Sequence, residues 1–143
     1  NLSFPVRSDE LVLSLLGKTL ALLPPDKAEA MAEEVGQQYG QAMAAGMQGD
    51  DLAAGHKSLR AAMQAVADAL TAHGFAAHTD QRNNQLRIVN NHCPFGDVAI
   101  EHPVICAVDR GMVKGMLTAI YGDTSPETSA SLPQGDTFCA TTI

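Results

Sequence analysis

Leucines at three- and four-residue spacings predict a helix near the start of the chain. Ser8 is a good capping residue for this helix, and the two acidic residues after it favour the positive end of a helix dipole. We expect the helix to run from about Ser8 to Leu23. Its apolar positions are Leu11, Leu15, Leu16, Leu20 and Leu23, with Val12, Leu13 and Leu22 beside them. Such a wide apolar surface predicts burial on more than one side, with a second subunit as one candidate partner.

A second helix is expected over roughly Asp26–Met47. The pair Pro24 and Pro25 ends the first helix and suits the start of the next one, because proline is tolerated in a first helical turn. Gly36 and Gly40 stand one turn apart within this helix. Small residues in that arrangement predict close packing against another helix.

The next segment changes from a helical period to an alternating one. A third helix is expected over Ser58–Ala72, followed by two alternating segments at Phe75–Gln81 and Gln85–Asn91. Asn83 and Asn84 lie between these segments, and asparagine tolerates the left-handed backbone of a tight turn. The pattern therefore predicts a β-hairpin.

The last part of the chain is predicted to form one long helix and two strands. A short helical stretch is expected over Phe95–Ile100, and a firmer helix over Pro103–Tyr121. Strands are expected at Glu127–Leu132 and Thr137–Ile143, separated by a turn rich in proline and glycine. The apolar stripe of the long helix consists of Val104, Val108, Met112, Met116 and Ile120.

These elements predict a single α+β domain over residues 1–143, with helices packed on a small antiparallel sheet in the order ααα-ββ-α-ββ. Residues 8–74 form the helical part of this prediction. Residues 75–143 contain the hairpin, the helix that carries a cysteine and the closing strands.

Composition and charge narrow the classes of function. The chain has 143 residues, 45% of them hydrophobic and 17% charged, which is typical of a globular protein and not of a disordered one. Its formal net charge of -7 repels nucleic acid, so we expect poor DNA binding by this chain alone. No apolar run approaches the ~18 residues of a membrane span, and no signal peptide is evident. The expectation is therefore a cytoplasmic protein without a membrane partner.

Cys93, Cys106 and Cys139 are the residues most suited to chemistry. Cys93 follows a predicted strand, and Cys106 lies near a predicted helix N-terminus, where the helix dipole stabilises a thiolate. A stabilised thiolate suits a metal ligand or a redox sensor. Cys139 can reach the same place if its strand lies in the sheet beside the hairpin. Spacing alone leaves a second interpretation open, in which all three are small buried hydrophobic residues.

The remaining polar residues give little support to an enzyme. His102 directly precedes Pro103 and either caps the helix or binds a metal, while His92 adjoins Cys93. The sequence contains no glycine-rich phosphate loop, no His-Glu-x-x-His motif and no spacing that suggests a catalytic triad. We therefore expect a protein without enzymatic activity.

Two segments have a more specific pattern. Asn91–Cys106 reads NHCPFGDVAIEHPVIC, and Leu132–Cys139 reads LPQGDTFC. Both resemble the C-terminal domain of a family of bacterial winged-helix regulators, often called ArsR-like, that includes repressors of iron-sulfur cluster assembly operons. Phe4 and Pro5, with the leucine-rich helix after them, are similar to the segment that follows the winged helix in that family.

The resemblance implies a sensory and dimerising module with a thiolate site. Cys93, Cys106 and Cys139 fall on cysteine positions of the family, which implies an iron-sulfur cluster or a single ion of iron or zinc. Ser131 stands where many members have another cysteine. Three thiolates then need His102, His92, a water molecule or an external ligand to complete the set, and His102 is the candidate that we name.

The same resemblance implies how the module acts. The winged-helix domain is missing from this chain, so residues 1–7 correspond to the linker that follows it. DNA binding is then expected only through that missing domain, and the partner of this chain is a second copy of itself. The predicted function is a metal- or cluster-sensing domain of a bacterial transcriptional regulator.

The alternative is a metal-free regulatory module that binds a small apolar molecule. Val108, Met112 and Met116 are the candidate lining residues, although their helical spacing is more often that of a plain core. A small metal-dependent enzyme is a third possibility, but no general base accompanies the cysteines at a recognisable spacing.

Overall fold

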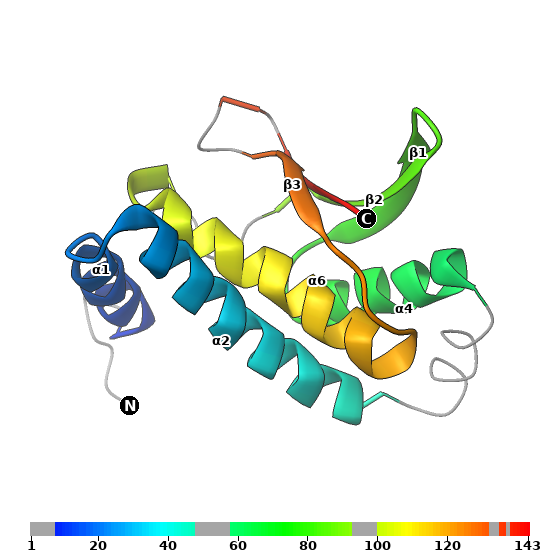
Figure 1. The fold of residues 1–143 in the computed structure, drawn as a ribbon, viewed down its shortest axis with the longest axis horizontal. Coiled ribbons are helices and arrows are strands. Elements are labelled where there is room, and N and C mark those ends of the chain that lie inside the picture. Colours follow the sequence, from blue (N-terminus) through cyan, green and yellow to red (C-terminus); the bar gives the residue numbers. More distant parts are fainter. Residues whose placement is uncertain (1–7, 48–57, 93–99, 132–134, 137) are drawn as a thin grey trace, which may run out of the picture.

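The computed structural model describes residues 8–47, 58–92, 100–131, 135–136 and 138–143. Three helices come first, then a hairpin, then one more helix and two strands, so the predicted α+β fold and element order are confirmed (Figure 1). The elements are α1 (Ser8–Leu20), α2 (Pro25–Ala45), α4 (Leu59–Ala72), β1 (Ala77–Arg82), β2 (Gln85–Asn90), the 3₁₀ helix η1 (Pro103–Ile105), α6 (Cys106–Ile120), β3 (Glu127–Ala130) and β4 (Cys139–Thr142).

The ends of the helices follow from local chemistry. α1 ends at Leu20, three residues before the predicted Leu23. Pro24 drives the residue before it, Leu23, out of the helical region. The backbone N–H groups of Leu22 and Leu23 donate to the carbonyls of Thr19 and Leu20, three residues back, so the helix closes in a tighter turn. α4 begins as predicted, with Ser58 as its N-cap, and the Ser58 hydroxyl accepts a hydrogen bond from the backbone N–H of Ala61 at 3.1 Å.

The closest helix pair is α2 with α6, and glycines make its approach possible. The two helices run side by side (Figure 1). Gly36 and Gly40 of α2 face backbone atoms of α6, while Gly111 and Gly115 of α6 face backbone atoms of α2. A Cβ atom at any of these four positions would overlap a carbonyl of the facing helix. The predicted role of Gly36 and Gly40 in close packing is thus confirmed.

The four strands form one antiparallel sheet in the order β1-β2-β4-β3. A two-residue turn joins β1 to β2, and both of its residues have positive φ, at 54° for Asn83 and 63° for Asn84. This is the turn geometry that matches the twist of a hairpin. β4 lies between β2 and β3. The strand that carries Cys139 therefore lies beside the hairpin, which is the condition under which we expected Cys139 to reach the place of the other cysteines.

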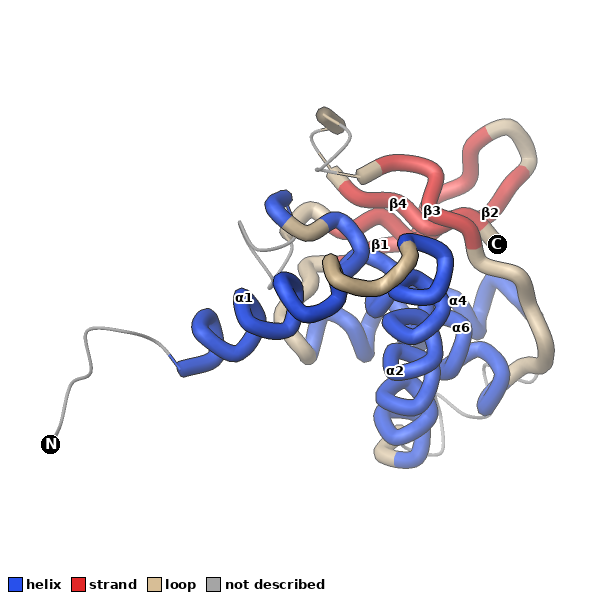
Figure 2. The backbone as a smooth tube through the Cα atoms, turned by 60° about the vertical axis from the view of Figure 1, so that its left-hand side comes forward, coloured by secondary structure: helices blue, strands red, loops and turns tan. Residues whose placement is uncertain are grey.

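The sheet covers one side of the helical layer, as the tube view shows (Figure 2). The main core lies between them and is built largely from α4 and α6, with Phe75 and Ile88 from the sheet side. Its largest fully buried side chains are Met63, Leu70, Ile88, Ile105, Met116, Leu117, Ile120, Val66 and Val113. A smaller cluster of Val89, Ala130 and Ala140 lies on the other face of the sheet.

α1 contrasts with the other helices because most of its apolar side chains are exposed. It projects away from the body of the molecule (Figure 2). Gly17 packs against the ring of His102, and Leu20 is buried, but Leu15 is 65% exposed and Leu22 is 85% exposed. Within one chain, therefore, the expectation that this helix is buried on more than one side is not met. No helix in the described part of the chain combines the length and hydropathy that a membrane crossing needs.

Candidate functional site

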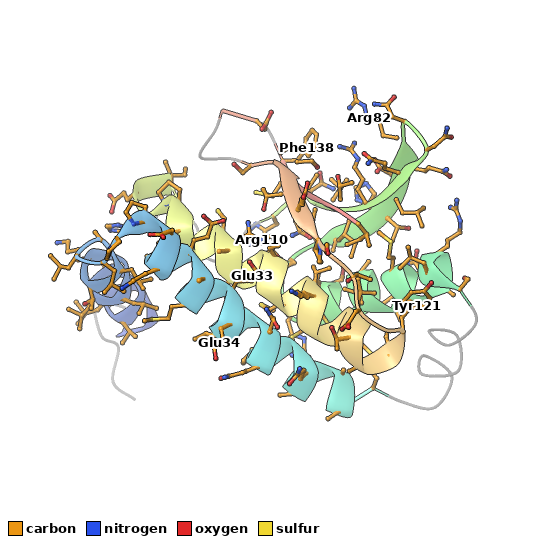
Figure 3. All side chains as sticks on the ribbon, in the orientation of Figure 1. Glu33, Glu34, Arg82, Arg110, Tyr121 and Phe138 are labelled. Carbon is orange, nitrogen blue, oxygen red and sulfur yellow. The ribbon has the colours of Figure 1, made fainter. Side chains whose placement is uncertain are left out.

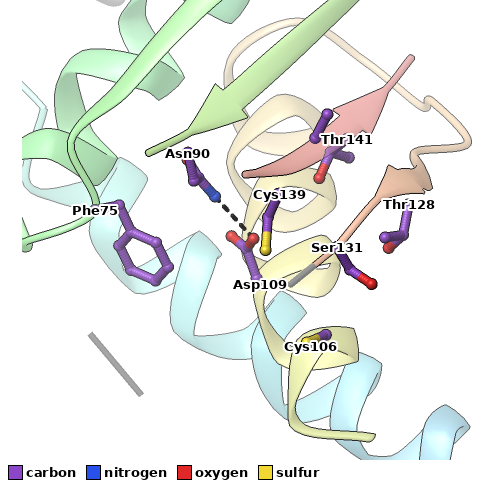
Figure 4. Close-up of a pocket in the computed structure, with 9 residues that line it drawn as sticks. Phe75, Asn90, Cys106, Asp109, Thr128, Ser131, Cys139 and Thr141 are labelled. Atoms are coloured by element: carbon purple, nitrogen blue, oxygen red, sulfur yellow. Dashed lines mark hydrogen bonds between the residues drawn. The ribbon is translucent and has the colours of Figure 1, made fainter. Parts of the chain in front are cut away.

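A small cavity lies between the sheet and the first turn of α6, with a volume of about 20 Å³ (Figure 4). This is room for roughly one water molecule. The sheet contributes polar side chains and a thiol, and α6 contributes a second thiol and a carboxylate. The residues around the cavity are Phe75, Asn90, Cys106, Asp109, Thr128, Ser131, Cys139, Ala140 and Thr141.

Two features of the backbone bring these side chains together. Asn90 and Cys139 are paired across the β2–β4 ladder, so their side chains leave the sheet on the same face. Cys106 and Asp109 are three residues apart in α6, so they lie on the same face of that helix. Because the sheet packs on this helix, the two pairs of side chains meet at one cavity.

Asp109 is the most perturbed ionisable group of the site. Burial of the carboxyl group raises the pKa of Asp109 to about 6, and the hydrogen bond from Asn90 opposes this shift. The Asn90 amide donates that bond from Nδ2 to Asp109 Oδ2 at 2.9 Å. Asp109 Oδ1 and Asn90 Oδ1 are both buried and have no hydrogen-bond partner within the described residues. Counting only partners from the described ranges, the site therefore holds two buried oxygens that accept no hydrogen bond.

The structure brings together some of the predicted metal ligands. Cys106 and Cys139 line the same cavity, each half-buried. Cys93 lies outside the described residues. His102 lies against Gly17 of α1 and is not among the residues that surround the cavity. As the described side chains stand, no three of type His, Cys, Asp or Glu are close enough to hold a metal ion jointly.

Ser131 also lines the cavity, and it is only 5% exposed. Its backbone N–H donates to Asp136 Oδ2 at 3.0 Å, which fixes the chain as it leaves β3. The position at which the resemblance implies a further cysteine is therefore next to the two thiols.

Asn90 and Asp109 were missed by the sequence reasoning. The spacing Cys106-x-x-Asp109 was a usable signal, since three residues of helix place a carboxylate beside a thiol. Asn90 gave no signal of its own. Its role depends on the pairing of β2 with β4, which only the fold reveals.

A larger cleft of about 480 Å³ lies on the other side of Cys106. Its apolar walls come from the end of α1, the start of α2 and the start of α6, and its polar end is Arg110. Arg110 donates to Glu29 at 2.8 Å and to Glu33 at 3.0 Å on α2. The residues around the cleft are Leu20, Ala21, Leu23, Pro25, Ala28, Glu29, Pro103, Val104, Cys106, Ala107, Arg110, Thr128 and Ser131.

The residues predicted for the alternative ligand site lie elsewhere. Met112 and Met116 belong to the main core, and Val108 packs against it. None of the three lines the small cavity or the cleft.

Arg110 and Glu33 form an ion pair that bridges α6 and α2, and Figure 3 shows their side chains pointing toward one another.

One comparison with known proteins bears on the whole domain. Residues 11–143 match the model of a family described as methanogen output domain 1. The chain belongs to this family. The match covers every described element except the first turn of α1, and so includes the cavity and the cleft. No curated protein that was compared matches the chain.

The match to methanogen output domain 1 does not test the resemblance to ArsR-like regulators, which stays a prediction. The family description contains the word output and gives no ligand, metal or reaction.

Proposed function

We propose that this methanogen output domain is a metal-responsive regulatory module without enzymatic activity, whose state depends on a metal ion or iron-sulfur cluster at the cavity. One observation carries the proposal. Cys106 and Cys139 come from distant parts of the chain, yet they line one cavity together with Asp109, whose buried carboxylate oxygen has no partner among the described residues. Thiolates and a carboxylate are suitable ligands for iron and zinc.

A buried carboxylate oxygen that has no hydrogen-bond partner among the described residues lowers stability, which supports a functional role. Burying a charged group without a compensating partner is unfavourable, so such groups are often found at sites of function. Cys93 follows Asn90 by three residues in the sequence and is our candidate for a third thiolate. The alternative to a regulatory site is a cavity that holds one water molecule and has only a structural role.

Contacts between neighbouring residues connect the cavity to α1 on the surface of the molecule. Cys106 directly follows η1, and His102 at the start of η1 touches Gly17 of α1. A ligand that joins Cys106 to Cys139 would fix the start of α6 relative to β4. We propose that this change alters the position of α1, which is the regulatory output.

The primary test is the content of metal and acid-labile sulfide in protein purified without oxygen and without a resin that leaches metal. Stoichiometric iron with sulfide supports a cluster, and zinc or iron without sulfide supports a single ion. Protein that contains no metal and takes up none from iron, iron with sulfide, or zinc contradicts the proposal.

Variants connect the metal to the proposed residues. Cys106→Ser and Cys139→Ser are each expected to lose bound metal while the far-ultraviolet circular dichroism stays unchanged, and Cys93→Ser tests the third thiolate. Ser129→Ala, a change on β3 at an exposed position, is the control and should keep the metal. Retention of stoichiometric metal by both Cys106→Ser and Cys139→Ser would show that the site is elsewhere.

We also propose that the module dimerises through α1 and the outer face of α2. The exposed large apolar residues include Leu11, Val12, Leu15, Leu16 and Leu22 around α1, and Met31, Val35 and Tyr39 on α2. An apolar surface of this extent is typical of an interface. A second copy fits α1, because its sequence begins with acidic residues and Lys18 lies in its last turn. Antiparallel pairing of two copies would place the acidic start of one α1 beside Lys18 of the other. The two helix dipoles would then also point in opposite directions, which is favourable.

The oligomeric state tests this interface. Light scattering of the purified chain should give the mass of a dimer, and Leu15→Glu should give the mass of a monomer. Thr118→Glu places the same charge on an exposed position of α6 and should remain dimeric. A monomeric wild-type chain at micromolar concentration would contradict the interface.

The cleft supports a second candidate function, the binding of a small molecule without metal. Its volume of about 480 Å³ lies in the range of small-molecule sites, and its walls are mostly apolar with Arg110 at one end. A ligand-dependent rise in melting temperature that persists in chelator would favour this candidate. Loss of that rise in a Val104→Glu variant, but not in Thr118→Glu, would assign it to the cleft.

A further inference from the structure

The cleft beside Cys106 adjoins a second hollow of similar size. This hollow has a volume of about 470 Å³ and lies between α2, α6 and the start of β3. Glu29, Arg110 and Thr128 line both the hollow and the cleft of about 480 Å³. We call the two spaces together the groove, with an apolar half in the cleft and a polar half in the hollow. The residues around the polar half are Glu29, Glu33, Arg110, Pro126, Glu127 and Thr128.

The apolar half is built into the packing of three helices. Leu20, Ala28 and Ala107 are each at most 5% exposed, and they come from α1, α2 and α6. Leu23 and Val104 line the same space and are half-buried. An apolar body that covers these side chains would release water from them, which is favourable. The apolar half therefore suits a hydrocarbon group of a small molecule.

Arg110 is engaged at all three nitrogens of its guanidinium group. Its Nε donates to Glu33 Oε2 at 3.3 Å, its Nη1 donates to Thr128 Oγ1 at 3.4 Å, and its Nη2 donates to Glu29 Oε1 at 2.8 Å. A carboxylate or phosphate group on a ligand would have to displace a glutamate to reach this arginine. Arg110 is therefore a poor anchor for an anion, although it lies where the two halves of the groove meet.

The polar half carries an excess of negative charge. Three glutamates and one arginine line it, and no lysine or histidine from the described part of the chain does so. The bonds from Arg110 use Oε1 of Glu29 and Oε2 of Glu33, so the second oxygen of each carboxylate takes no part in them. The side chain of Glu33 is only 24% exposed, which reduces the screening of its charge by water. This half of the groove is thus complementary to a cation that donates hydrogen bonds.

We propose that the groove binds a small molecule with an apolar body and a protonated amino group. The apolar body lies between α1, α2 and α6, and the ammonium group lies beside Glu29 and Glu33. An ammonium group has three N–H donors, which match the carboxylate oxygens that Arg110 does not use. This inference rests on the second candidate function, binding in the cleft, and names the chemical class of its ligand. It does not depend on the proposed metal.

The test is a titration of the isotope-labelled full chain with octylamine, octanol and octanoate, followed by two-dimensional NMR at neutral pH and low salt. The three probes share one alkyl chain and differ in their head group, which is cationic, neutral or anionic. Octylamine should shift the backbone amides of Ala28, Glu29, Ala107 and Arg110 until saturation. It should bind roughly threefold to fivefold more tightly than octanol, and octanoate should bind most weakly. Added salt should remove most of the difference between octylamine and octanol.

Variants assign each part of the ligand to one half of the groove. Glu29→Gln should lower the affinity for octylamine toward that for octanol and leave octanol binding unchanged. Glu34→Gln is the matched control, because Glu34 is exposed on α2 and lines neither half. Leu23→Ser should weaken both probes, whereas Leu22→Ser, at the exposed neighbouring position, should weaken neither. Circular dichroism of each variant checks that the fold is kept.

The outcomes separate this inference from the function on which it rests. Equal affinity for octylamine and octanoate, or equal octylamine binding by Glu29→Gln and Glu34→Gln, would overturn the cationic class and leave binding in the cleft standing. Shifts of the same amides when the ligand-free chain is diluted would show that a second copy occupies the groove, which would also overturn it. A chain that none of the three probes perturbs would contradict both the inference and the second candidate function.

Discussion

Cys139 stands directly opposite Asn90 in the β2–β4 pair. This register turns both side chains toward α6, where Asp109 accepts the Asn90 hydrogen bond at 2.9 Å. A slip of β4 by one residue would send the Cys139 side chain to the other face of the sheet, away from Asn90. The arrangement of the cavity therefore depends on strand pairing as much as on the identity of its residues.

Asp109 is expected to lower the stability of the metal-free protein at neutral pH. The pKa of Asp109 rises from its ordinary 3.8 to about 6 in the folded chain. Between these values the folded chain holds a proton that the unfolded chain has released. The free energy of unfolding therefore falls as pH rises through this window, by roughly 3 kcal/mol, and stays low above it.

Asp109→Asn should remove that dependence. In chelator, the variant is expected to be more stable than the wild type at pH 7, by up to about 3 kcal/mol, and equally stable near pH 4. Denaturant unfolding at several pH values measures this difference. The other titratable side chains that line the cavity in the described structure are Cys106 and Cys139. Asp68→Asn, on an exposed position of α4, should leave the pH profile unchanged.

The glycine contact between α2 and α6 should tolerate no side chain. Gly111→Ala places a Cβ against the carbonyl of Glu33, so the helices must separate. We expect a loss of about 1–3 kcal/mol in the free energy of unfolding. Gly46→Ala is the matched control because a Cβ there meets only ordinary contacts, and its effect should be near zero. Equal stabilities for these two variants would contradict the packing described.

The hairpin turn gives a prediction about backbone strain. Asn84 has φ of 63°, a conformation that alanine adopts at a cost of about 1–2 kcal/mol and glycine adopts readily. Asn84→Ala should therefore lower the melting temperature, and Asn84→Gly should leave it unchanged or raise it. If both variants melt alike, the turn does not adopt this conformation in solution.

Ser131→Cys should add a thiolate to the cavity. Because Ser131 lines the same space as Cys106 and Cys139, the new sulfur can join the same ion. We expect tighter Co²⁺ binding and a stronger charge-transfer band. Ser129→Cys puts the same group on the exposed part of β3 and should change neither. Identical titrations of both variants would show that Ser131 does not face the ion.

Most of the fold was predictable from local patterns. A helix begins at Ser58 as expected, and the Asn83–Asn84 pair forms the expected turn. The glycines of α2 predicted a close helix contact, but they could not identify α6 as the partner. That partner follows from Gly111 and Gly115, whose own spacing was the matching signal.

The candidate site was predictable only in part. Cys106 and Cys139 were identified because thiols are rare and chemically distinct. Asp109 and Asn90 were not, because a carboxylate in a helix and an amide at a strand end are usually solvated. Only burial makes them unusual, and burial depends on which strands pair. The same argument explains α1, whose leucines predict a buried helix although one chain alone does not cover them.

The central place of β4 also determines the order in which the domain can assemble during synthesis. β4 is made after every other described element, yet it pairs with both β2 and β3. Until it emerges from the ribosome, the hairpin and β3 present open edges, and the helices have only half of their covering sheet. The nascent chain is therefore most exposed to aggregation just before β4 inserts, and the two thiols of the cavity meet only at that last step.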